Sequence, residues 1–170
     1  LGRHGASLEL VVQEPAVVGP DHATSGDAVL LRKAILTDGE LAVALIGSSV
    51  VPDARIVYAT KECELDAFIE IDLGTERPVV FAAKVAAYLD LYRSGTWRER
   101  FATWPLVLTV APTAVRAVSL RRTTERVLRA LPDGDALAHV TEFCFAALPH
   151  LLDAGPLGEI WQVAGHLGFE

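Results

Sequence analysis

The chain has 170 residues, 51% of them apolar, and a formal net charge of −7. This length and composition predict a single domain with a sizeable core, and the negative charge argues against a surface that coats polyanions in general. No apolar run reaches the roughly 18 residues that span a bilayer, and Cys63 and Cys144 lack metal-site spacing, so we expect a reduced, cytoplasmic protein without membrane contact.

The first half of the chain favours strands. A loop rich in Pro and Gly ends near residue 27, and residues 40–49, "ELAVALIGSS", favour a strand. Residues 54–60 predict another strand, and "KECE" predicts the turn to a strand at 65–73. In this last strand Phe68, Glu70 and Asp72 share one face, because successive side chains of a strand alternate between faces.

A long helix is predicted at residues 78–94. Thr75 is a candidate N-cap, and Pro78 suits the first helical turn. Four apolar or aromatic side chains recur at helical spacing on one face: Phe81, Val85, Tyr88 and Tyr92.

The remaining elements alternate between strand and helix. The patterns predict a buried strand at 104–112, a helix at 113–131, a last strand at 136–146, and a short helix with a final helical turn within 148–165. The order β-β-β-α-β-α-β-α is typical of an α/β fold with a mixed central sheet flanked by helices.

Three acidic residues are placed to meet at one end of the predicted hairpin. Asp53 precedes the strand at 54–60, and Glu70 and Asp72 project from the next strand to the same side. Converging carboxylates repel one another unless a cation lies among them or one is protonated. Mg²⁺ or Mn²⁺ is the ion that such a set of oxygen ligands predicts, and it would serve phosphate chemistry.

Lys84 lies beside Tyr88 at the edge of the apolar face of the helix, where it can reach toward these acids. We predict that it orients a water molecule or a phosphate as a compact charge. The alternative is that the acids form the exposed side of a half-buried sheet and that Lys84 extends to solvent along the edge of the helix.

A second cationic feature is the helix at 113–131, which contains five Arg and one acidic residue. Arg122, Arg126 and Arg129 share a face at i, i+4 and i+7, which suits contact with a nucleic-acid backbone. The alternative is a solvated helix face.

The pattern of Asp53 after Pro52, Glu70 and Asp72 two residues apart, and Lys84 on the next helix resembles the PD-(D/E)XK nuclease superfamily. This resemblance implies a restriction-endonuclease-like fold, with Asp53, Glu70, Asp72 and Lys84 as catalytic residues and the three acids as metal ligands. The chain departs from the pattern at Asp72, where the superfamily usually has Lys.

A closer resemblance covers residues 51–110. The strand "EIDLGTE" at 70–76, followed by Lys84, Tyr88, Trp97 and "PLVLTV", resembles the replication-relaxation family of plasmids and mobile elements. Members of that family carry a winged-helix part ahead of this region. The chain contains no Met, so we expect it to be a fragment of a longer protein that includes such a part.

These resemblances imply a DNA-transaction domain of a replication protein, with DNA as partner and a homodimer as a further possibility. Two hypotheses follow: a Mg²⁺- or Mn²⁺-dependent DNA nuclease, or an inactive nuclease-fold module that binds DNA or protein. The Asp at the usual Lys position favours the second hypothesis, and the acids with Lys84 favour the first.

Overall fold

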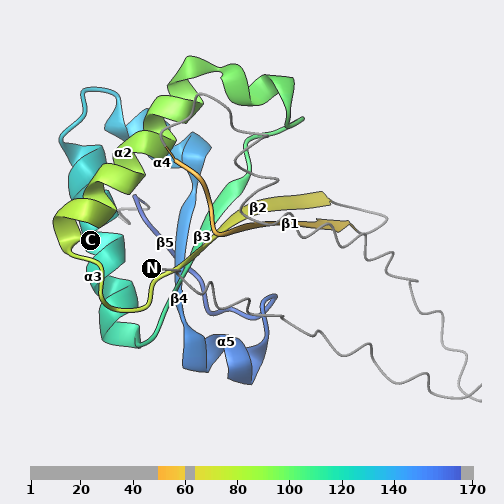
Figure 1. The fold of residues 1–170 in the computed structure, drawn as a ribbon, viewed down its shortest axis with the longest axis vertical. Helices are drawn as coiled ribbons and strands as arrows, with labels where there is room; N and C mark the ends of the chain where they lie inside the picture. Colours follow the sequence, from red (N-terminus) through yellow and green to blue (C-terminus); the bar gives the residue numbers. More distant parts are fainter. Residues whose placement is uncertain (1–49, 60–63, 166–170) are drawn as a thin grey trace, which may run out of the picture.

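The computed structural model describes residues 50–59 and 64–165, and in this part of the chain the strands form one mixed sheet (Figure 1). The strand order in the sheet follows the sequence. The strands are β1 (Ala54–Ala59), β2 (Glu64–Ile71), β3 (Leu106–Ala111), β4 (Phe143–Ala147) and β5 (Gln162–Val163).

The centre of the sheet is parallel and its two edges are antiparallel. β2, β3 and β4 run parallel, with Ile71 beside Val110, whereas β1 pairs antiparallel with β2 and β5 antiparallel with β4. Every residue of β4 is buried, which is usual for a central strand covered on both faces. The carboxyl ends of three neighbouring strands therefore meet at one edge of the sheet.

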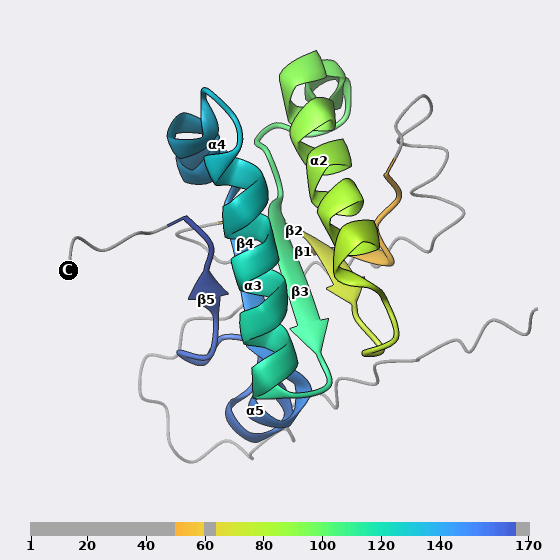
Figure 2. The ribbon, with the colours of Figure 1, turned by 90° about the vertical axis from the view of Figure 1, so that its left-hand side faces the viewer.

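The predicted α/β class with a mixed, helix-flanked sheet is confirmed. The helices are α2 (Pro78–Ser94), α3 (Ala114–Arg129), α4 (Gly134–Thr141) and α5 (Leu148–Ala154), with a 3-10 turn, η1 (Thr96–Glu99), after α2. Figure 2 shows α2 and α3 side by side across one face of the sheet. In the part of the chain that the structure describes, no helix is both long and apolar enough to cross a membrane.

The two long helices begin and end where local chemistry directs. α2 begins at Pro78, whose fixed φ suits a first turn, and ends at Gly95, whose φ of 72° closes the last turn. α3 begins after Thr113, whose hydroxyl accepts a hydrogen bond from the backbone N–H of Arg116.

The main core lies between the sheet and these helices. Phe68 of β2 is fully buried, and its ring contacts those of Tyr88, Phe101 and Trp104. On the opposite face a small cluster contains Ala67, Leu108 and Cys144, with half-buried side chains around it. Trp97 and Trp104 pack within the protein, as the sequence predicts.

Three local predictions are wrong. Arg77, not Thr75, is the N-cap of α2, and it makes no side-chain cap. The strand expected at 136–146 is instead α4 followed by β4, because a short apolar run fits either state until its neighbours are known. The expected final helical turn is the strand β5, which pairs with β4. The strand predicted at 40–49 lies outside the described residues.

Candidate functional site

The candidate site lies where β2 leads into α2, and Asp53 is held against this end of β2. The backbone N–H of Asp53 donates to the carbonyl of Ile69 at 3.0 Å, and its Oδ2 accepts from the backbone N–H of Ile71 at 2.7 Å. The antiparallel β1–β2 pairing, with Ala54 beside Ile69, brings Asp53 there. Asp53 is exposed to solvent.

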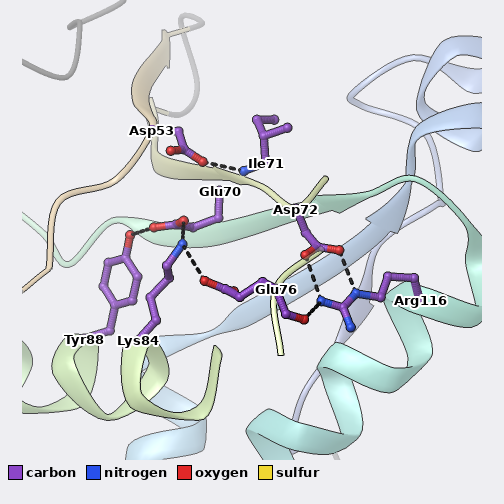
Figure 3. A network of polar contacts seen from close by, with 8 residues as sticks. All are labelled: Asp53, Glu70, Ile71, Asp72, Glu76, Lys84, Tyr88 and Arg116. Atoms are coloured by element: carbon purple, nitrogen blue, oxygen red, sulfur yellow. Dashed lines mark hydrogen bonds and ion pairs between the residues drawn. The ribbon is translucent and has the colours of Figure 1, made fainter. Parts of the chain in front are cut away.

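Glu70 is a buried carboxylate with two donors from α2. Only 2% of the residue is exposed. Its Oε2 accepts from Lys84 Nζ at 2.7 Å, and its Oε1 accepts from the Tyr88 hydroxyl at 2.5 Å (Figure 3). Lys84 and Tyr88 are four residues apart, so they lie one helical turn from each other and reach the same carboxylate. The predicted approach of Lys84 to Glu70 is confirmed.

Burial and charge shift the pKa values of this network. Burial raises the pKa of Glu70, and the hydrogen bonds from Lys84 and Tyr88 partly oppose this shift. Burial alone would lower the pKa of Lys84, but the hydrogen bond and charge of Glu70, with the charges of Glu76 and Asp53, raise it. The pKa of Tyr88 is well above its ordinary value, through burial first and then Glu70. Lys84 therefore keeps its proton at neutral pH.

Asp72 belongs to a separate contact made by α3. Arg116 donates to it from Nε at 2.7 Å and from Nη2 at 2.9 Å, and also to the backbone carbonyl of Glu76 at 2.6 Å. The hydrogen bond to Asp72 is the main reason that the pKa of Arg116 is raised. A two-pronged guanidinium–carboxylate contact is among the strongest polar contacts in proteins, so Asp72 is fully engaged.

The structure thus divides the predicted site residues into three groups. Asp53, Glu70 and Lys84 influence one another electrostatically, whereas Asp72 is engaged by Arg116 (Figure 3). The three arginines of α3, Arg122, Arg126 and Arg129, are exposed away from both.

The described residues do not fit the predicted metal ion in this arrangement. Among residues 50–59 and 64–165, no group of three His, Cys, Asp or Glu side chains is arranged to hold one. Lys84 Nζ already contacts Glu70 and lies 3.9 Å from Glu76, so the position that an ion would take beside Glu70 contains an ammonium group.

Sequence reasoning did not find three residues of the network. Tyr88 was assigned to the core, where its ring does lie, but its hydroxyl is the second donor to Glu70. Arg116 and Glu76 were not singled out. The available signal for Arg116 was its place in the first turn of a helix that follows a buried strand, because neighbouring parallel strands bring their carboxyl ends to the same edge.

Comparisons with known proteins place the first two strands and α2 in a family context. Residues 22–107, half of the chain, match the family model described as replication-relaxation. The matched segment includes Asp53, Glu70, Asp72 and Lys84, and it ends before α3. No curated protein matches the chain, and no solved structure matches it.

Proposed function

The chain belongs to the replication-relaxation family, and on this premise we propose that it serves DNA replication or transfer as a binding module, not as a nuclease. Family membership itself points to a role in DNA replication or transfer. The non-catalytic assignment rests on the partners of the acidic residues.

The observation that carries the proposal is the position of Lys84 Nζ. It lies 2.7 Å from a carboxylate whose side chain is only 3% exposed, while the Lys84 side chain itself is 30% exposed. The ammonium group therefore lies on the solvent side of Glu70 and supplies the positive charge that the buried carboxylate requires. A divalent ion would have to displace Lys84 to reach Glu70.

Asp72 supports the same proposal. Its side chain is 3% exposed and both of its oxygens accept from Arg116. A carboxylate with this partner has no free oxygen facing a shared metal position. The residue that replaces the usual Lys of the nuclease pattern is therefore explained by a structural contact.

A second candidate, a Mg²⁺- or Mn²⁺-dependent DNA phosphodiesterase, is favoured by one observation about Asp53. This carboxylate is exposed and close enough for its charge to act on Glu70 and Lys84. In that case Asp53 and Glu70 would hold the ion, and Lys84 would move to make room for it. A homodimer stays a prediction under either candidate.

Thermal melting with and without millimolar Mg²⁺ or Mn²⁺ tests the proposal. A ligand that binds the folded state raises Tm. We expect no rise for the natural chain beyond that of an Asp153→Asn control, which removes an exposed acid in α5 far along the sequence from the site. A rise that Glu70→Gln abolishes, or Mn²⁺-dependent cleavage of DNA that Lys84→Met abolishes, would contradict the proposal.

The Lys84→Met variant provides the complementary measurement. Removing the ammonium group leaves Asp53, Glu70 and Glu76 without their shared cation, so Mn²⁺ should now raise Tm. The rise should disappear in the Glu70→Gln, Lys84→Met double variant. A variant that stays indifferent to Mn²⁺ would show that Lys84 does not occupy an ion position, even if the natural chain is also indifferent.

A further inference from the structure

The outer face of α3 concentrates positive charge in an acidic protein. The helix has five Arg and one Glu, whereas the whole chain has a net charge of −7. Arg116 is occupied at the first turn by Asp72. The exposed side chains of Arg122, Arg126 and Arg129, named here the arginine row, lie in the second half of the helix.

The arginine row has little neutralising charge among the described residues. Arg126 donates to the carbonyl of Arg122 at 3.3 Å and to Thr123 Oγ1 at 2.9 Å, and both acceptors are uncharged. Glu125 is the acid of this helix, and it pairs with Arg121 and, at 3.6 Å, with Arg129. Arg122 has no ion pair within the described residues.

The spacing of the row suits a chain of phosphates. With a rise of about 1.5 Å per residue, Arg122 and Arg126 are about 6 Å apart along the axis, and Arg129 is about 10 Å from Arg122. Phosphates along one DNA strand recur about every 3.4 Å of helix axis, so the row spans two or three of them. Planar guanidinium groups match phosphate oxygens in a two-pronged contact.

We infer that the arginine row binds the phosphate backbone of a nucleic acid without reading its bases. This inference rests on the proposed function, because a DNA-replication role makes nucleic acid the fitting polyanion. It also goes beyond the family match, which ends before α3. A depression in the surface follows the same face, with Val118 between the row and the start of the helix, and gives the backbone a place to lie.

The experiment compares two variants that each remove two positive charges. Arg122→Gln with Arg126→Gln removes half of the row's region, and Arg77→Gln with Arg100→Gln removes two exposed arginines elsewhere. Binding of a fluorescent 30-base-pair duplex to the 170-residue chain is followed by anisotropy at several salt concentrations. Melting curves first establish that both variants fold.

The row variant should bind at least about tenfold more weakly than the control variant. Its plot of log affinity against log salt should lose a slope of roughly two, because each lost phosphate contact removes about 0.9. Equal losses in the two variants, or no binding by the natural chain at low salt, would overturn the inference. The metal-dependent melting experiment above is independent of these outcomes, so failure of either proposal can be recognised separately.

An acidic protein segment is the competing partner for such a surface. Fluorescent polyglutamate serves as its probe in the same titrations. Loss of polyglutamate binding in the row variant, with duplex binding unchanged, would overturn the nucleic-acid inference. Weaker binding of the duplex with a reduced salt slope supports it.

Discussion

At the scale of single residues, buried ionisable groups are tolerated here because each has a defined protonation state. Glu70 is stabilised as a carboxylate by an ammonium group and a hydroxyl. Cys144 has no such help: it is 6% exposed in the middle of β4, and burial raises the pKa of its thiol to about 11 from an ordinary 9.0. The folded state therefore prefers the neutral thiol.

The pKa of Cys144 predicts how stability depends on alkaline pH. Because the folded pKa is the higher one, the folded chain holds more protons than the unfolded chain above pH 9. Its contribution is complete below pH 9 and is lost as the pH rises toward 11, by about 2 kcal/mol in total. Urea unfolding between pH 8 and 11 measures this loss.

Cys144→Ala is the matched variant for this measurement. It should be less stable at pH 8, because it leaves a small cavity, but its stability should fall less between pH 9 and 10. Above pH 10 the raised pKa values of Tyr88 and Lys84 act in the same direction in both proteins. Parallel curves from pH 8 to 10 would show that the thiol does not titrate as its burial requires.

At the scale of elements, Arg116 connects the β2–α2 loop to α3. It contacts Asp72 just after β2 and the carbonyl of Glu76 just before α2. A second ion pair, between Arg93 and Asp133, connects the end of α2 to the start of α4. The side chains of the first pair are 17% and 3% exposed, and those of the second are 36% and 51% exposed.

This difference in exposure predicts unequal costs for removing the arginines. Arg116→Met leaves Asp72 charged and buried, and the free energy of unfolding should fall by about 3–5 kcal/mol at pH 7. Arg93→Met removes a solvent-screened contact and should cost at most about 1 kcal/mol. Chemical denaturation of both variants provides the comparison.

The Asp72→Asn, Arg116→Met double variant isolates the cause. With both charges removed, it should recover part of the stability that Arg116→Met loses, because the uncompensated carboxylate is gone. Equal costs for Arg116→Met and Arg93→Met would mean that water reaches Asp72 and that the contact does not hold the loop.

At the scale of the whole molecule, the sheet carries two unequal clusters. The helix-covered face contains the large core with its aromatic rings, and the opposite face contains the small cluster around Ala67, Leu108 and Cys144. Phe68 and Ile69 are neighbours in β2 and project to these two faces. Phe68 is fully buried and Ile69 is half-buried among the described residues.

Truncating these two neighbours should reveal the asymmetry. Phe68→Ala removes the ring at the centre of the aromatic contacts and should lower the free energy of unfolding by about 3–5 kcal/mol. Ile69→Ala should cost about 1 kcal/mol, since a half-buried side chain contributes part of full burial. Urea midpoints with unchanged m-values would measure both. A larger cost for Ile69→Ala would place the stronger core on the other face.

The sequence alone was informative where structure depends on near neighbours. The limits of α2 follow from Pro78, the spacing of Phe81, Val85 and Tyr88, and Gly95, all of which act within one or two helical turns. The closeness of Lys84 to Glu70 followed from strand alternation and helical period together. The segment at 134–147 was read wrongly because its short apolar pattern fits both helix and strand, and pairing with β3 decides where β4 begins.

Tertiary structure alone decided how the acidic residues are used. Asp72 and Arg116 are 44 positions apart, and they meet because β2 and β3 run parallel and bring their carboxyl ends to one edge. Neither residue type nor spacing predicts this meeting. Local sequence determined which charged groups exist and which face each occupies, whereas the packing of distant elements determined which opposite charge each one meets, because that choice depends on distances that only the folded sheet sets.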